Sequence, residues 1–360
     1  MGFPTRRPRR ELLDELREVV LSDGPHLSVY LDLVGPTVPA RERFLASVDR
    51  DVVPSTVVEQ VADLVEVAQK SDDALFACLA SSAGPLVATT FPDPPTHDVV
   101  DVAGVPRIGP FLESEQSLLH HVVAVLDRSG MTLIASPRHG EVVRETLIGH
   151  NPDGAAELIA RVAHLTDTSL VLIVGSPSTL DAIHPLVVRD GRLFCPVLRI
   201  DIDDERQSDA ELAEEMVRHV ADRSARRVVE ALRLYRYFES HGAGADGVVA
   251  SVQALRSGRA SMLLVHDDPD DERHGWFGAD PAHIGYDLAD AALATPDIGG
   301  EHPHIESGRL VDVVLRSAIG QGVPVMVVPS VPDERLADGM GVIFHVDGFA
   351  DDGLAELVER

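Results

Sequence analysis

The stretch Gly247–His266, GVVASVQALRSGRASMLLVH, decides the fold of this chain. Its first half carries apolar residues at helical spacing, which predict a helix with one apolar face. These residues are Val248, Val249, Val252 and Leu255. Asp246 is placed to cap this helix, and Gly258 is placed to end it, because glycine tolerates the left-handed conformation. The unbroken apolar run Met262–Val265 predicts a buried strand, so the whole stretch is a helix-turn-strand unit of a layered α/β module.

A first α/β module is predicted at the N-terminus by the same kind of pattern. Apolar periodicity predicts helices over 11–21, 41–48 and 57–69, and strands over 27–33, 74–80 and 85–90. The last two strands are joined by a hairpin turn, and the proline-rich stretch 91–98 predicts a loop. We place the end of this module near residue 118.

A middle module is predicted next, in the order strand-strand-helix-strand-helix-strand. The strands are predicted over 121–127, 131–135, 170–174 and 193–200, and the helices over 155–164 and 180–187. The stretch 136–154 is predicted to be a loop. The loop Gly175–Thr179 precedes a helix, where backbone N–H groups can hold an anion.

One long helix is predicted after the middle module. Ser208 and Glu211 form a capping box, and the helical pattern continues to about Glu239. Some thirty residues at 1.5 Å each would span roughly 45 Å, enough to bridge two domains. After the helix-turn-strand quoted above, a further helix is predicted over 308–319, with strands over 323–328 and 341–346.

The predicted fold class is therefore α/β (α+β), with three small layered domains of which the second and third are joined by a long helix. The predicted division is an N-terminal α/β domain over 1–118, a middle α/β domain over 119–205, the connecting helix over 206–240, and a C-terminal α/β domain over 241–360.

Composition excludes several classes of protein. The formal net charge of −28 argues against a general nucleic-acid-binding protein, since phosphate contacts need a positive surface. Lysine occurs once, so nearly all positive charge is arginine, whose guanidinium binds phosphate in a forked geometry. The longest apolar runs are far shorter than the ~18 residues of a membrane span. Cys78 and Cys195 lie in apolar runs and are predicted to be small buried residues of a cytoplasmic protein.

The acidic stretch 267–283, DDPDDERHGWFGADPAH, is predicted to be a solvated loop, because its carboxylates and histidines have no specific metal-ligand spacing. No Ser/His/Asp arrangement, phosphate-binding glycine loop or zinc spacing occurs in the sequence. We therefore predict no metal site and no cofactor.

Three segments, one in each module, resemble segments of a known family. They are VYLDL at 29–33, VVAVLDRSG at 122–130 and ALRSGRASMLLV at 254–265. The C-terminal stretches LRSAIGQGVPVMVVPS at 315–330 and DGMGVIFHV at 338–346 add to them. Together with the order of elements, they resemble bacterial relatives of the archaeo-eukaryotic release factor/Pelota family. Actinobacterial hibernation factors of the Balon-like type are the most similar in layout.

This resemblance implies a tRNA-mimicking protein that binds the ribosome. The middle domain is expected to reach the peptidyl-transferase centre, and the first domain the decoding region. The C-terminal domain, similar to kink-turn-binding ribosomal proteins, is expected to dock a partner such as an elongation factor or a translational GTPase.

The sequence departs from the family in the middle domain. Hydrolytic members carry Gly-Gly-Gln, or a variant, in a loop that positions a water and stabilises charge at the ester carbonyl. The corresponding stretch 136–154, SPRHGEVVRETLIGHNPDG, contains no glutamine and no glycine pair. The triplet Gly320–Gly322 reads Gly-Gln-Gly, but it follows a predicted helix and is predicted to be a helix-ending turn.

Two sets of candidate functional residues remain. Weak candidates for acid/base chemistry in the middle-domain loop are His139, Glu141 and His150. Candidates for contact with ribosomal RNA are Arg6, Arg7, Arg9, Arg10, Arg218, Arg223, Arg226, Arg227, Arg233 and Arg236. The competing interpretation of the arginines in the long helix is a solvated helix, acidic first and basic last as the helix dipole favours.

The leading hypothesis is a ribosome-associated, tRNA-mimicking translation factor without the hydrolytic tripeptide, acting in ribosome hibernation or stalled-ribosome handling. This hypothesis favours a protein without enzymatic activity, but leaves that point open; the protein is expected to bind ribosomal RNA and a protein partner, and not membranes. The first alternative is a peptidyl-tRNA hydrolase with an atypical middle-domain loop. The second is a stress-related protein that binds a small ligand or a protein, which the acidic loops favour.

Overall fold

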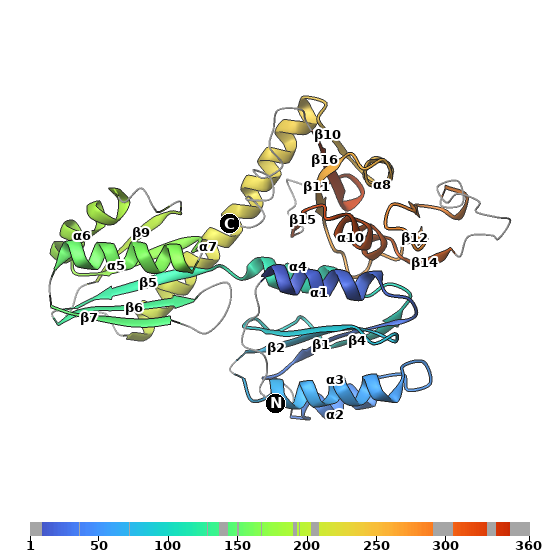
Figure 1. Cartoon of the computed structure of the whole chain (residues 1–360), viewed down its shortest axis with the longest axis horizontal. Helices are drawn as coiled ribbons and strands as arrows, with labels where there is room; N and C mark the ends of the chain where they lie inside the picture. The colour runs from blue at the N-terminus through green and yellow to red at the C-terminus, as the bar shows by residue number, and fades with distance from the viewer. Residues whose placement is uncertain are drawn as a thin grey trace. The chain divides into compact units, whose positions relative to one another are not determined.

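A computed structural model shows a chain of alternating helices and strands (Figure 1), which confirms the α/β (α+β) fold class. It describes residues 9–35, 37–71, 73–127, 129–136, 143–149, 151–166, 168–189, 193, 195–202, 209–290, 305–329 and 336–345. Contacts divide the chain into two compact units, one of Arg10–Gln116 with Val228–Glu359 and the other of Ser117–Arg227. Within the described ranges, no helix is long and apolar enough to cross a membrane.

The N-terminal part of the first unit is an antiparallel sheet covered by helices on both faces (Figure 1). In the order β3-β2-β1-β4, its strands are β3 (Leu86–Phe91), β2 (Leu75–Ser81), β1 (His26–Asp32) and β4 (Val99–Ala103). One face is covered by α2 (Ala40–Ser47) and α3 (Ser55–Ala68), the other by α1 (Arg9–Leu21) and α4 (Gly109–Ser117). The sequence predicted all of these elements except β4 and α4.

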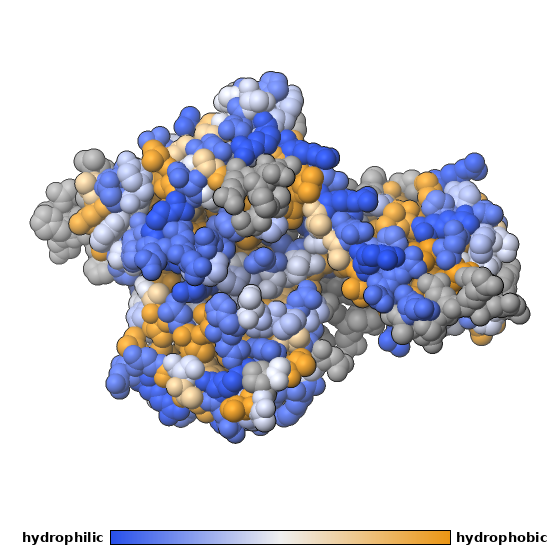
Figure 2. Space-filling model, turned by 180° about the vertical axis from the view of Figure 1, so that it is seen from behind, coloured by the Kyte–Doolittle hydropathy of each residue, from blue (hydrophilic) through white to orange (hydrophobic). Residues whose placement is uncertain are grey.

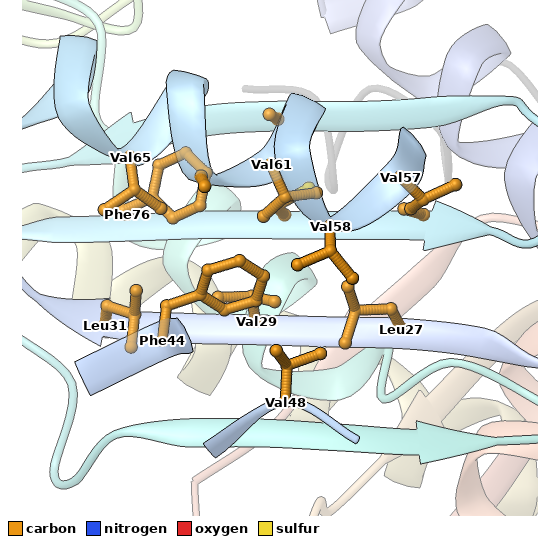
Figure 3. Close-up of a cluster of buried hydrophobic side chains, with 14 of the residues drawn as sticks. Leu27, Val29, Leu31, Phe44, Val48, Val57, Val58, Val61, Val65 and Phe76 are labelled. Carbon is orange, nitrogen blue, oxygen red and sulfur yellow. The ribbon is translucent and has the colours of Figure 1, made fainter. Parts of the chain in front are cut away.

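Alternation along the strands builds the core between this sheet and α2 and α3. Leu27, Val29 and Leu31 of β1 point to the same face, because every second strand residue does so. Figure 3 shows them under Phe44 of α2 and the valines of α3. Phe44 is completely buried, so α2 is held by one aromatic side chain despite its weak amphipathic pattern.

The C-terminal part of the first unit contains two small sheets. The first has the order β10-β16-β11-β15, with β10 (Gly244–Asp246), β16 (Met340–Phe344), β11 (Ala260–Val265) and β15 (Val325–Val327). The second has the order β13-β12-β14, with β13 (Ile284–Gly285), β12 (His274–Phe277) and β14 (Glu306–Arg309). The helices are α8 (Val248–Arg256) and α10 (Leu310–Gln321), with a short 3₁₀ turn η1 (Ala337–Gly339).

The helix-turn-strand of Gly247–His266 is present as α8 and β11, but two of its details were wrong. Gly247, with φ of +92°, is the N-cap residue, and no side chain caps the helix. The Asp246 carboxylate instead lies in β10 and accepts a hydrogen bond from the Ala337 N–H at 2.8 Å. Val249 is 47% exposed, so the buried face is narrower than predicted.

Two further predictions for this part have clear outcomes. The helix-ending turn is confirmed, because Gly322 ends α10 in the left-handed conformation with φ of +73°. The acidic stretch 267–283 is not only a solvated loop, since it contains β12. Gly275 and Phe277 of β12 are buried and pair with β14. This strand was not predicted because charged residues surround it in the sequence.

A buried ionic cluster joins the N-terminal and C-terminal parts of the first unit. The Arg309 guanidinium lies between the carboxylates of Asp267 and Asp312, with Arg309 Nη1 3.2 Å from Asp312 Oδ2. Asp312 is 1% exposed, and its Oδ1 accepts a hydrogen bond from the Ile108 N–H at 3.0 Å. A Cβ on Gly109 would come within 1.8 Å of Asp267 Oδ2, so the backbone before α4 approaches the cluster closely.

The side chain of Gln116 makes a second connection between these parts. Gln116 Nε2 donates to Val325 O at 2.8 Å, and Gln116 Oε1 accepts from the Val327 N–H at 3.0 Å. Because β15 is the last strand of its sheet, its outer edge would otherwise present unpaired backbone groups. The Gln116 amide satisfies two of them. Arg17 Nη2 of α1 also donates to Gly320 O, at 2.7 Å.

The second unit is a five-stranded sheet in the order β7-β6-β5-β8-β9. Its strands are β7 (Val143–Ile148), β6 (Gly130–Ser136), β5 (His121–Leu126), β8 (Leu170–Gly175) and β9 (Val197–Asp201). The last three are parallel to one another, whereas β5, β6 and β7 are antiparallel. The helices α5 (Pro152–Leu165) and α6 (Pro177–Arg189) pack on one face.

The predicted loop 136–154 was wrong in part, because β7 lies inside it. β7 is an edge strand with mostly exposed side chains, so it lacks the buried alternation by which strands are found in sequences. Gly130 pairs with Ile148, and a Cβ on Gly130 would come within 2.0 Å of Leu147 O. Only glycine therefore allows the start of β6 to approach β7 so closely.

Burial raises the pKa of Asp312 from its ordinary 3.8 to about 7, against the attraction of Arg309. The folded state thus binds this proton more tightly than the unfolded chain. The contribution of Asp312 to stability is fully present below about pH 4 and is lost as the pH rises toward about 7. The Asp312→Asn variant has no titrating group at this position. We therefore expect its unfolding free energy, minus that of the wild type, to increase with pH over this range by at most about 1.4 kcal/mol per pH unit.

Urea denaturation at several pH values measures this difference. Asp101→Asn is the control, because its carboxylate pairs with Arg107 at a half-exposed position, 3.0 Å apart. Parallel pH profiles for wild type and Asp312→Asn would contradict the assignment.

For Gln116→Ala, we expect a loss of about 1–3 kcal/mol of stability, because an N–H and a C=O of β15 lose their hydrogen bonds. We also expect faster hydrogen exchange of the Val327 amide, which donates to Gln116 Oε1. Gln253→Ala, at an exposed position of α8, is the control. Unchanged exchange at Val327 would show that the amide does not protect this edge.

Candidate nucleic-acid interface

The long helix α7 (Asp209–Ser240) takes part in the cores of both units. In the second unit, Leu212, Met216 and Val220 of its first half pack against buried side chains of the five-stranded sheet. This is the face of the sheet opposite α5 and α6. The three-to-four-residue spacing of these apolar side chains places them on one side of the helix.

In the first unit, the second half of α7 packs on the sheet of the C-terminal part. Leu232, Tyr235 and Phe238 are almost completely buried there. The Tyr235 ring lies directly on β16, since a Cβ on Gly341 would come within 2.7 Å of it. Burial, followed by the nearby Asp246 carboxylate, raises the pKa of Tyr235 well above its ordinary value, so the phenol stays neutral.

The middle of α7 carries four of the candidate arginines in different surroundings. The Arg218 side chain is 65% exposed, and its Nη2 lies 3.5 Å from Glu215 Oε1. Arg223 is half-buried and Arg227 is 5% exposed, so neither presents its whole guanidinium to a ligand. Arg226 is exposed, and no described residue forms an ion pair with it.

The last two turns of α7 carry the other two arginines. Arg236 lies between two carboxylates, with its Nη1 2.9 Å from Glu239 Oε2 and 3.2 Å from Asp246 Oδ2. Arg233 is exposed and has no ion-pair partner among the described residues. Arg226 and Arg233 are seven residues apart, which is two helical turns, so both lie on one side of α7. We call this side the outer face of α7.

The surroundings therefore separate the six predicted arginines of α7. Arg218 and Arg236 pair with acids, whereas Arg226 and Arg233 are exposed and have no ion-pair partner among the described residues. From Arg218 to Ser240 the helix contains six arginines and three carboxylates, against a net charge of −28 for the chain. This segment is thus a local exception to the acidity of the protein.

Several predicted residues cannot be placed. Arg6, Arg7, His139, Glu141 and His150 lie outside the described residues. Arg9 and Arg10 lie in the first turn of α1, but their side chains are not described.

Sequence reasoning missed two exposed rings beyond Arg233. Tyr237 and His241 follow it at steps of four residues, the spacing of one side of a helix. Tyr237 is 56% exposed, and its ring centroid lies 4.3 Å from that of His241. The four-residue spacing from Arg233 to Tyr237 and His241 is the signal in the sequence that could have found them.

The second unit contains a small cavity of about 220 Å³. It lies at the carboxyl end of β5 and the amino ends of α5 and α6, and residues lining it include Leu126, Met131, Asn151, Ala155, Thr179 and Ile183. The lining is mostly apolar. Ser176 and Thr179, predicted to lie where an anion could bind, bond to each other through their hydroxyls at 2.8 Å.

The described residues show no arrangement of three His, Cys, Asp or Glu side chains that could hold a metal ion. Cys78 is buried and Cys195 half-buried, and both are free thiols. Burial raises the pKa of Cys78 to about 12, so this thiol is not a nucleophile.

No protein-family model and no curated protein matches this sequence. Solved structures match over nearly the whole chain. An archaeal translation termination factor, aRF1, is 15% identical, with 94% of this chain and 98% of that chain covered and a TM-score of 0.24. Archaeal Pelota, bound to the ribosome with ABCE1, is 11% identical, with 96% and 95% covered and a TM-score of 0.41. Archaeoglobus fulgidus Pelota is 13% identical, with 96% and 95% covered and a TM-score of 0.37.

Proposed function

We propose that this chain is a ribosome-associated, tRNA-mimicking translation factor that docks on ribosomal RNA through the outer face of α7 and does not hydrolyse peptidyl-tRNA. The observation that carries the proposal is the exposure of Arg226 and Arg233 on one side of α7, without ionic partners in the described part of the chain. Exposed guanidinium groups bind phosphate oxygens through charge-assisted, often bidentate hydrogen bonds.

The lack of hydrolysis is supported by the stretch that would carry it. Residues 136–154 contain no glutamine and no glycine pair, and no glutamine occurs between Gln116 and Gln207. Part of this stretch is the edge strand β7, which pairs with β6 along its whole length. Neither feature supplies the oriented backbone N–H groups and water that ester hydrolysis needs.

The proposed setting is ribosome hibernation or the handling of stalled ribosomes, as the sequence resemblance implies. A factor that occupies the ribosome without cleaving its substrate would keep that ribosome inactive. The N-terminal and C-terminal parts pack into one unit, so we propose that they act together on the ribosome. We also propose that the C-terminal part docks an elongation factor or a translational GTPase.

Sedimentation with purified bacterial ribosomes at increasing salt tests the RNA contact. For Arg226→Ala/Arg233→Ala, we expect weaker binding and a slope of log affinity against log salt that is smaller by roughly two, because two phosphate contacts are lost. Arg41→Ala/Arg161→Ala is the control with the same change in charge, since these arginines pair with Glu66 and Glu145.

Equal loss in both double variants would mean that only net charge matters and would overturn the role of α7. The wider proposal has its own test in cells. If the tagged protein is absent from ribosomal fractions of starved cells at low salt, it is not a ribosome-associated factor.

The cavity of the second unit supports a second candidate function, the binding of a small ligand. Its volume of about 220 Å³ is below the roughly 300–1,000 Å³ of most ligand pockets, so only a small molecule would fit. Its place at the carboxyl ends of parallel strands is where α/β sheets commonly bind ligands.

Ligand-observed NMR with a library of small molecules tests this function. We expect any specific binder to be lost in Ala182→Phe, whose ring would fill the cavity from α6. Ala163→Ser, on the opposite end of α5 and away from the cavity lining, should leave binding unchanged. A binder that is insensitive to Ala182→Phe would show that the cavity is not a site.

A further inference from the structure

Two exposed rings, those of Tyr237 and His241, lie against each other at the end of α7. The ring centroids of Tyr237 and His241 are 4.3 Å apart, and their planes are inclined by 35°. Tyr237 is 56% exposed and His241 is also exposed. A tyrosine ring with this much exposed surface can accept another planar group.

The exposed pair is held in place by the buried residues around it. Phe238 is 4% exposed in the core under α7, and its ring packs edge-on against Tyr237 with centroids 5.6 Å apart. The Tyr237 carbonyl oxygen accepts hydrogen bonds from Ser240 Oγ at 2.8 Å and from His241 Nδ1 at 2.7 Å. The second ring is therefore fixed relative to the first, so a ligand would not have to order it.

An exposed arginine lies next to the rings. Arg233 lies four residues before Tyr237, one turn away on the same side of α7. The nearby carboxylates of Glu239 and Asp246 both pair with Arg236, at 2.9 and 3.2 Å, and not with Arg233. Figure 2 shows the top of the molecule, formed by the end of α7 and the following turn, in blue to white. An apolar protein interface would be orange there.

An exposed ring one helical turn from an exposed guanidinium matches the two parts of an unpaired nucleotide. The base can stack on the ring, while the guanidinium binds its phosphate. A base-paired duplex presents phosphates but no free base face, so it would use Arg233 alone.

We propose that Tyr237 and His241 form a stacking platform for an unpaired base of RNA, with Arg233 on the adjacent phosphate. This inference rests on the proposed function, because it names the kind of RNA that the outer face of α7 recognises. It adds a preference for loops, bulges and ends over duplex.

Binding of short RNAs to the full chain tests the platform. One RNA is a single strand containing 2-aminopurine, whose fluorescence is quenched by stacking, and the other is a blunt duplex. For Tyr237→Ala, we expect about tenfold weaker binding of the single strand, loss of the quenching and unchanged duplex binding. Tyr237→Phe should retain the ring and the binding. Tyr286→Ala removes another exposed tyrosine, 38% exposed, as the control.

The outcomes separate this inference from the proposed function. If Tyr237→Ala binds and quenches the single strand as wild type does, the platform is overturned, while the salt dependence of Arg226→Ala/Arg233→Ala can still support RNA docking. If neither RNA nor ribosomes bind, both proposals fail. If Tyr237→Ala reduces ribosome binding but neither RNA form is affected, the rings contact a protein and the RNA assignment is overturned.

Discussion

The first unit depends on the contact of one buried guanidinium with two carboxylates. Arg309 supplies a single positive charge to Asp267 and Asp312, so the cluster is satisfied only when all three side chains and the Ile108 N–H are in place. Removing one partner of such a cluster leaves a buried charge unpaired, which costs several kcal/mol, on the order of 3–5. Because Asp312 of α10 accepts the hydrogen bond of the Ile108 N–H, the ionic cluster connects α10 to the residue directly before α4.

A second constraint acts on α7, whose two halves belong to different cores. Leu212 and Met216 are held by the sheet of the second unit, whereas Tyr235 and Phe238 are held by that of the first. Each half must keep its own apolar side inward, so the remaining sides are the ones free for function. In the basic second half of α7, Tyr235 packs on Gly341. The sides of the helix that do not pack in this way are therefore exposed. Core packing therefore determines which side of α7, with which charged residues, forms the candidate interface.

Much of this fold was predictable because its central strands are buried on both faces. The apolar runs of β2, β8 and β11 are unbroken, and the sequence predicted all three. β4 and β7 escaped prediction because both are edge strands whose side chains are half-buried or exposed, so they lack a buried alternation. The candidate site was predictable only as a list of arginines. Which of them pair with acids depends on contacts such as Arg236 with Asp246, and helical periodicity says nothing about those.

The bond of Gln116 to β15 has a consequence for how the chain is made. The N-terminal part leaves the biosynthetic machinery first, so α4 is already available when β15 emerges more than two hundred residues later. Gln116 then closes an edge that could otherwise pair with the same edge of another molecule. The N-terminal part thus protects the edge of β15 in the C-terminal part from pairing with another molecule. A C-terminal fragment produced without the N-terminal part would expose the edge of β15, which can pair with other molecules.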